Sequence, residues 1–167
     1  MLRKLTFFFL LIACLASQGL AQDMTLDRLK FHLNEEAYKI QENGAVVEYE
    51  LDSVRIYLIT DVASDRMRLM AGIVEEEQLT AKDLKVLMEA NYDRALDAKY
   101  ALSDGVLWAV FVHPLKDLTT AVLKSGLYQV RNLVYSYGTS YTSTQFVFGG
   151  EEDDGGDQRS DRLVASD

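Results

Sequence analysis

Two histidines, His32 and His113, are the only imidazole side chains that the sequence offers for acid–base catalysis or metal binding. A metal or general-base role for either one would require carboxylates that folding brings alongside. His113 immediately precedes Pro114, which ends a strand because proline has no N–H to donate. This position favours a structural role for His113.

Two acidic runs could attract a cation. Side chains in the extended run Glu75–Glu77 point to alternate sides, which does not build a single oxygen cage. The run Asp153–Asp157 lacks the spacing and the terminal glutamate of a calcium-binding loop. No serine is framed as Gly-x-Ser-x-Gly, and the single cysteine is Cys14. We therefore expect no catalytic residue, no metal site, no cofactor and no enzymatic activity.

Composition narrows the class of partner. The chain has 167 residues and a formal net charge of −9. Because the chain is acidic and has no basic stripe, we expect it to bind neither nucleic acid nor anionic membranes. Removal of a leader and a tail would leave roughly 120–130 residues, which fits one domain.

Residues 1–21 have the pattern of a secretory signal peptide. Arg3 and Lys4 form the positive end, Leu5–Ala16 is an apolar core too short to span a membrane, and Gly19–Ala21 is a small-x-small cleavage site. The alternative is a bacterial lipoprotein in which Cys14 is lipidated. Both interpretations predict export. The leader resembles bacterial signal peptides, which indicates a periplasmic or secreted bacterial protein.

Hydrophobic periodicity predicts three helices and five strands, in the order α-β-β-β-α-β-β-α. Thr25–Gln41 has an apolar helical stripe that Asn43-Gly44 would end. Three period-two segments follow it and predict an antiparallel meander. The expected strands, from first to last, are Ala45–Leu51, Val54–Thr60, Met67–Val74, Ala98–Leu102 and Val106–His113. We expect an α+β domain over residues 22–148, with an antiparallel five-stranded sheet.

The stretch from Thr80 to Tyr141 contains the second and third predicted helices, with the last two predicted strands between them. Thr80 and Asp83 form a capping-box pattern before a helix whose apolar stripe is Leu84, Leu87, Met88, Asn91 and Ala95. Asp104-Gly105 predicts a hairpin turn. Asp117 or Thr119 would cap a long last helix, with Gly138 just past its end.

The last strand, Val106–His113, is apolar on both faces, which indicates that helices or a partner subunit cover it. After Tyr141, Ser143–Phe148 is either a short extra strand or an apolar end that docks on the domain. Residues 149–167 are acidic and glycine-rich, which predicts a disordered tail.

The chain resembles the superfamily that joins type III secretion chaperones of the CesT kind and the YbjN family. The resemblance covers roughly Thr25–Tyr141 and consists of the element order, the helix Leu84-x-x-Leu87-Met88-x-x-Asn91-Tyr92, the Asp104-Gly105 hairpin, and His113-Pro114-Leu115 before the last helix. It implies a helix-packed sheet, a homodimer and no active site. The secretion chaperones are cytosolic, so the export signal favours the YbjN-like interpretation.

Four apolar residues are the candidates for a partner or dimer interface: Val86, Tyr92, Trp108 and Phe111. A contiguous apolar patch on a small domain usually marks an interface. We predict an exported, non-enzymatic protein-binding module, chaperone-like or an adaptor, of the bacterial cell envelope. The alternatives are a YbjN-like regulatory or structural envelope protein that binds no unfolded client and, less favoured, a metal-dependent hydrolase.

Overall fold

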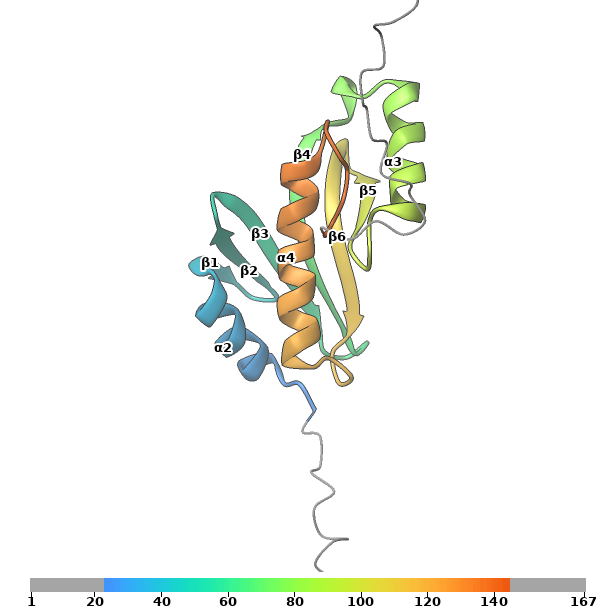
Figure 1. Cartoon of the computed structure of the whole chain (residues 1–167). Helices are drawn as coiled ribbons and strands as arrows, with labels where there is room; N and C mark the ends of the chain where they lie inside the picture. Colours follow the sequence, from blue (N-terminus) through green and yellow to red (C-terminus); the bar gives the residue numbers. More distant parts are fainter. Residues whose placement is uncertain (1–22, 145–167) are drawn as a thin grey trace, which may run out of the picture.

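The structure is a computed structural model that describes residues 23–144 (Figure 1). The predicted leader 1–21 and the predicted acidic tail 149–167 lie outside the described residues. Of the segment Ser143–Phe148, only the first two residues are described.

The described residues form three α-helices, one short 3₁₀ helix and six strands. In chain order they are α2 (Leu26–Glu36), β1 (Tyr38–Asn43), β2 (Val46–Leu51), β3 (Val54–Asp61), β4 (Arg66–Glu75), η1 (Glu76–Gln78), α3 (Ala81–Asp93), β5 (Lys99–Ser103), β6 (Val106–Pro114) and α4 (Thr120–Ser136). The strands make one antiparallel sheet in the order β1-β2-β3-β4-β6-β5. The α+β class and the three helices agree with the prediction, but the sheet has six strands and not five.

The additional strand, β1, comes from residues that the sequence analysis assigned to the first helix. That helix ends at Glu36, and Ala37 already has an extended backbone. Asn43-Gly44 then turns the chain from β1 into β2, with Gly44 at a φ of +58°. Glycine reaches this left-handed region without the steric cost that a Cβ would add. Asn-Gly therefore acts here as a hairpin turn and not as a helix end.

One face of the sheet carries the core. Helix α4 crosses this face, and α2 packs beside α4 on the same side (Figure 1). Strand side chains on this face are fully buried in the core, among them Tyr49, Ile56, Leu58, Leu69 and Phe111. A Cβ at Gly126 of α4 would lie only 2.6 Å from the Phe111 ring, so the glycine allows the helix to approach the sheet closely.

Polar side chains fasten α2 to α4. Glu36 accepts hydrogen bonds from Lys124 Nζ at 2.5 Å and from the Tyr128 hydroxyl at 2.7 Å. The Lys124 hydrogen bond, followed by that of Tyr128, holds the pKa of Glu36 below its usual range. His32 bridges the same two helices, since its Nε2 lies 3.1 Å from the Thr120 hydroxyl.

Helix α3 begins with the predicted capping box between Thr80 and Asp83. Its Asn91 side chain binds the edge of β5: the amide nitrogen donates to the Tyr100 carbonyl at 2.9 Å, and the amide oxygen accepts from the Tyr100 N–H at 2.8 Å. Asn91 thus satisfies part of the outer edge of β5 as a neighbouring strand would.

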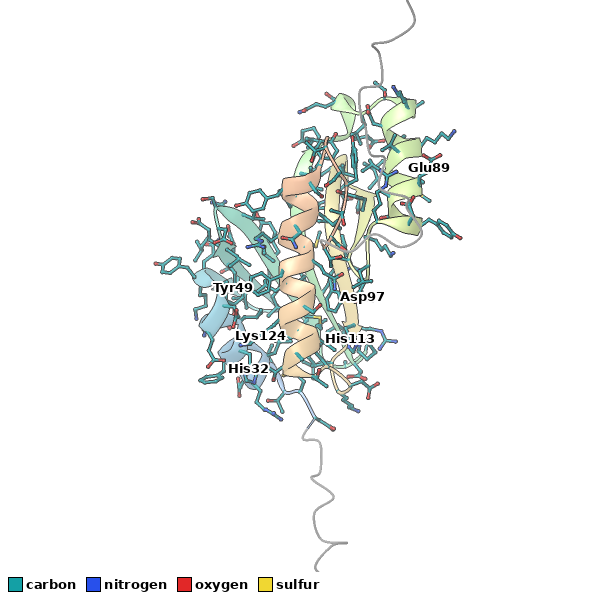
Figure 2. All side chains as sticks on the ribbon, in the orientation of Figure 1. His32, Tyr49, Glu89, Asp97, His113 and Lys124 are labelled. Atoms are coloured by element: carbon teal, nitrogen blue, oxygen red, sulfur yellow. The ribbon has the colours of Figure 1, made fainter. Side chains whose placement is uncertain are left out.

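Helix α4 also holds the start of β5. The buried Gln129 side chain accepts hydrogen bonds from the backbone N–H groups of Asp97 and Ala98, at 2.8 and 3.0 Å (Figure 2 labels Asp97). Its amide nitrogen donates to the Asp97 carboxylate at 3.2 Å. The alternative caps for α4 are resolved, because Thr119 and not Asp117 occupies the N-cap position. Gly138, with a φ of +76°, follows the helix end as predicted.

Candidate partner-binding surface

The second face of the sheet has no helix packed on it within residues 23–144. We call it the open sheet face. It carries side chains that alternate with the buried ones along β3, β4 and β6. Its apolar members are all half-buried or exposed: Tyr57, Ile59, Met70, Trp108, Val110 and Val112. The apolar character of both faces of β6, noted in the sequence, therefore reflects one covered and one uncovered face.

The strand register aligns these side chains into rows. One row runs Tyr57–Met70–Val110 across β3, β4 and β6. The row ends in a charged residue on each side, with Glu48 on β2 and Lys99 on β5. Cross-strand neighbours on one face lie close enough to form a continuous surface. This row is therefore apolar in the middle and charged at its margins. The neighbouring row, Ile59–Arg68–Val112, places an exposed arginine of β4 between two apolar side chains.

Both marginal charges already have partners within the chain. Glu48 is buried and accepts from Arg55 Nε at 2.8 Å and from the Gln41 amide at 2.6 Å. Lys99 Nζ donates to the backbone carbonyls of Asn91 and Ala95, at 2.6 and 2.7 Å, at the carboxyl end of α3. A cation at the carboxyl end of a helix complements the helix dipole.

Trp108 is the largest side chain of the open sheet face. It lies across from Gly72 of β4, where a Cβ would be 3.5 Å from the indole ring. The Tyr57 ring meets the indole edge-on at a centroid distance of 6.2 Å. The indole N–H donates to the Ser103 carbonyl at 3.1 Å. With its polar atom satisfied in this way, the ring has only apolar surface left to bury.

A hollow of about 370 Å³ opens beside Trp108, where β3 and β4 separate. Pairing between these strands ends at Tyr57–Met70, although β3 begins at Val54 and β4 continues to Glu75. The hollow is lined from both strands, from β6 and from α4: Ser53, Val54, Arg55, Tyr57, Gly72, Trp108, Val134 and Tyr135. Unpaired strand edges beside an aromatic side chain form the kind of site to which an extended peptide adds as a strand.

The structure separates the four interface candidates. Phe111 is only 2 % exposed and packs in the core under Gly126, so it is not a surface residue. Trp108 lies on the open sheet face, whereas Val86 and Tyr92 lie on α3 beside the β5 edge. Val86 is half-buried, and Tyr92 is 91 % exposed. The candidates therefore belong to the core and to two different surfaces.

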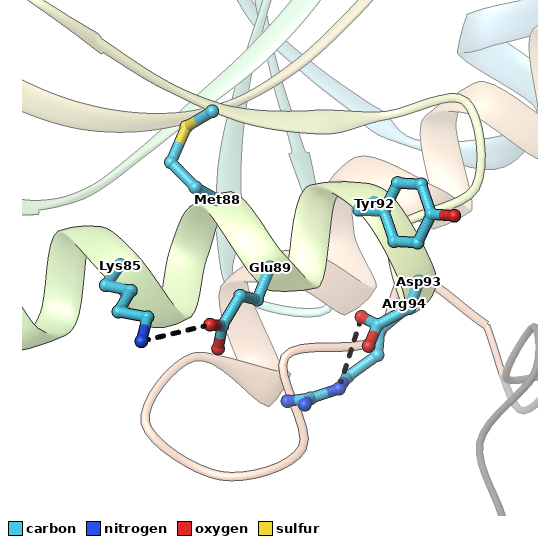
Figure 3. A pocket seen from close by; sticks show the side chains of 6 residues that line it. All are labelled: Lys85, Met88, Glu89, Tyr92, Asp93 and Arg94. Atoms are coloured by element: carbon cyan, nitrogen blue, oxygen red, sulfur yellow. Dashed lines mark ion pairs between the residues drawn. The ribbon is translucent and has the colours of Figure 1, made fainter.

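The second surface is an apolar stripe on α3, formed by Leu84, Met88 and Tyr92 at intervals of four residues. Sequence analysis placed Leu84 and Met88 on one apolar stripe with Leu87, and the structure shows Met88 68 % exposed. The fully buried residues are instead Leu87 and Ala90. Figure 3 shows Met88 and Tyr92 projecting from one side of α3, with the Lys85–Glu89 and Arg94–Asp93 ion pairs elsewhere around the helix. We call this feature the α3 stripe.

The two histidines lie on different elements (Figure 2). His32 Nδ1 is 3.1 Å from Glu35, and His113 Nδ1 is 2.7 Å from the Pro114 carbonyl. His113 also stacks on Phe111, with the ring centroids 6.0 Å apart. Within residues 23–144, no group of three or more His, Cys, Asp or Glu side chains could hold a metal ion.

Sequence reasoning did not single out Tyr57, Ile59 or Met70 as surface residues. Strand alternation already placed Tyr57 and Ile59 on the same side of β3. The alternation does not predict which side of the strand the helices cover, because that depends on contacts between distant elements. The available signal was the apolar character of both faces of β6.

Comparisons with known proteins support the fold. No protein-family model matches this sequence, and no curated protein sequence matches it either. A chain in the structure of the HopA1–SchA chaperone–effector complex is similar in fold, with 14 % sequence identity and a TM-score of 0.52; the match covers 65 % of this chain and 88 % of that one. A chain of the ExsC–ExsE complex matches with 15 % identity and a TM-score of 0.51, covering 65 % and 87 %.

These likenesses establish a fold similar to that of chains in a chaperone–effector complex. The resemblance to the YbjN family stays a prediction, since no family model supports it. Among the described helices, none combines the length and the apolar character needed to cross a bilayer.

Proposed function

We propose that this chain is an exported, non-enzymatic module of the bacterial cell envelope that binds an extended segment of a protein client on its open sheet face. The observation that carries the proposal is the uncovered apolar face around Trp108, beside the hollow where β3 and β4 separate. The similar chain of the HopA1–SchA structure comes from a complex described as chaperone and effector, which supports protein binding as the function.

The mode of binding follows from the groups that the face presents. An extended client strand would pair with the free edges of β3 or β4, and its apolar side chains would cover Trp108 and Tyr57. Main-chain pairing recognises extended backbone of almost any sequence, whereas the indole and the hollow select large apolar side chains. The charged margins at Glu48 and Lys99 keep their internal partners.

We also propose that the chain forms a homodimer, as the family resemblance implies. Two further surfaces could carry it. One is the α3 stripe, and the other is the outer edge of β1, around which Phe31, Tyr38 and Ile40 are exposed. Light scattering on the chain Gln22–Asp167 would give the mass, with a value twice that of the chain expected.

The test of client binding uses a matched pair of substitutions. Val112 lies on the open sheet face and is 51 % exposed, whereas Val62 lies in the β3–β4 turn and is 61 % exposed. Each is replaced with glutamate in the chain Gln22–Asp167, which then captures proteins from envelope extract. We expect Val112→Glu to reduce recovery of the recurrent partner at least tenfold, and Val62→Glu to leave it unchanged. Equal recovery by both variants would refute the assignment of this face.

Export has its own test. Mass spectrometry of the protein from the envelope fraction should give an N-terminus at Gln22. A lipidated Cys14 would establish the lipoprotein alternative, and an intact Met1 in the cytosolic fraction would contradict export.

A further inference from the structure

The last described residues end beside the carboxyl end of α3. The N–H of buried Ser143 donates to the Arg94 carbonyl at 3.3 Å, and its hydroxyl accepts from the Leu96 N–H at 2.7 Å. The Asn132 amide of α4 donates to the Ser143 carbonyl at 2.9 Å. These bonds fix the point at which the chain leaves the domain, one or two turns of helix from Tyr92 and Met88.

The residues that follow have the pattern of an apolar strand. Gln145-Phe146-Val147-Phe148 precedes Gly149-Gly150 and then four consecutive acids. In an extended chain, Phe146 and Phe148 lie on the same side, roughly 6.6 Å apart. Residues four apart on a helix, such as Met88 and Tyr92, are separated by about 6 Å along the axis. The spacing of the two phenyl rings thus matches that of the two exposed side chains.

We propose that Gln145–Phe148 docks along the α3 stripe of its own chain, with Phe146 against Tyr92 and Phe148 against Met88. The reach is sufficient, because four extended residues after Thr144 span roughly 13 Å, whereas the axial distance from Arg94 back to Met88 is about 9 Å. Aromatic pairing favours the first contact, and the affinity of a thioether for an aromatic ring favours the second.

Apolar contact and not charge drives this docking. The shallow groove of about 370 Å³ on this part of α3 is lined by Met88 and Tyr92 together with four charged residues, which pair with each other as Lys85–Glu89 and Arg94–Asp93 (Figure 3). These pairs leave little net charge in the groove. The acidic run Glu151–Asp154 therefore gains nothing from this groove.

Two consequences follow. The docked segment removes the α3 stripe from contact with a second copy, which leaves the outer edge of β1 as the surface for a homodimer. A partner that requires the α3 stripe would first have to displace the segment. The second consequence rests on the proposed function, whereas the docking itself does not.

Cys14 is the single cysteine, so the chain Gln22–Asp167 contains none and any disulfide must join introduced cysteines. In the chain Gln22–Asp167, Met88→Cys is combined with Phe148→Cys. The matched control combines Phe31→Cys with Phe148→Cys, because Phe31 is also apolar and is 60 % exposed, but lies on α2 at the opposite side of the molecule from α3 (Figure 1). Both proteins are oxidised at low concentration, and the fraction cross-linked is measured without reductant.

We expect the protein with Met88→Cys and Phe148→Cys to form its disulfide within one chain at least ten times faster than the control protein. Equal rates for the two proteins would overturn the proposal. A cross-link formed only between two chains would also overturn it, since a second copy would then occupy the α3 stripe. Neither result depends on client binding, so failure of the docking is distinguishable from failure of the proposed function.

A second measurement requires no cysteine. Phe146→Ser with Phe148→Ser should speed amide hydrogen exchange in α3 and leave α2 unchanged. Unchanged exchange in α3 would contradict the docking.

Discussion

Phe111 and Trp108 are three residues apart in β6 and lie on opposite faces of the sheet. The sequence predicts their separation, because side chains alternate along a strand. It does not predict which of them is buried, since that depends on Gly126 in a helix that begins after the strand has ended. Close approach of α4 at Gly126 makes Phe111 a core residue and leaves Trp108 on the uncovered face.

Gly126→Ala tests this packing. A Cβ there would lie within 3 Å of three ring atoms of buried Phe111, and overpacking of a core costs about 1–3 kcal/mol. Alanine would regain roughly 1 kcal/mol of helix propensity, so we expect the free energy of unfolding in urea to fall by up to about 2 kcal/mol. Phe111→Leu should reduce this loss in the double variant. A Gly126→Ala protein that is more stable than the parent would show that α4 does not approach so closely.

For Tyr49 we predict that a substitution retains or increases stability, in contrast to the loss expected for Gly126→Ala. Its hydroxyl is buried and has no hydrogen-bond partner among the described residues, and burial raises the pKa of this phenol to about 12. Removing an unsatisfied buried hydroxyl relieves a desolvation cost of about 1–3 kcal/mol. We therefore expect Tyr49→Phe to retain or increase stability in thermal unfolding. A clear loss of stability would mean that the hydroxyl has a partner.

At the scale of elements, β1 shows where sequence patterns mislead. Leu29 and Leu33 form a helical stripe whose spacing continues through Ala37 and Ile40, so the pattern predicts a longer helix. All six residues of β1 are exposed. The alternation of apolar and polar residues in this strand covers only Tyr38–Gln41, and Ile40 also fits the helical stripe. Pairing with β2, which no single-segment pattern contains, decides the conformation.

The start of α3, by contrast, was predictable from four consecutive residues. The Asp83 carboxylate accepts hydrogen bonds from the Thr80 hydroxyl at 2.6 Å and from its N–H at 2.8 Å, which lower the pKa of Asp83. Because the pKa is lower in the folded state, this carboxylate stabilises the fold above its ordinary pKa of about 3.9. The contribution is lost as the pH falls through the lower, folded-state value.

We therefore expect Asp83→Asn to lower the urea midpoint near neutral pH and to have little effect at a pH well below about 4. A difference that stays constant across this range would contradict the capping role. Thr80→Ala, which removes the other half of the box, should cost about 1 kcal/mol of stability at neutral pH.

The contact between α3 and the sheet edge gives a further prediction. Asn91→Ala would leave the N–H and the carbonyl of Tyr100 without their partners. We expect a loss of about 1–3 kcal/mol in unfolding free energy, together with faster amide exchange at Tyr100. Asn91→Asp retains the acceptor and loses the donor, so it should protect the Tyr100 N–H but not restore full stability. Unchanged exchange at Tyr100 in Asn91→Ala would contradict a stabilising role for these two hydrogen bonds.

At the scale of the whole molecule, the fold leaves three apolar surfaces without cover among residues 23–144. They are the open sheet face around Trp108, the α3 stripe and the outer edge of β1. Surfaces of this kind on a small domain usually mark interaction sites. We assign them to a client, to the chain's own Gln145–Phe148 segment and to a second copy, respectively. The sequence predicted an interaction surface but joined residues of the core, α3 and the open sheet face into one patch.

Trp108 is the only tryptophan in the chain, so its fluorescence reports directly on the open sheet face. The most direct test of the central claim is a titration of the chain Gln22–Asp167 with a tryptophan-free peptide from the captured partner. We predict that the Trp108 emission shifts to shorter wavelength and saturates as the peptide binds, and that Val112→Glu weakens this binding at least tenfold. Peptide binding that leaves the Trp108 emission unchanged would contradict client binding on the open sheet face.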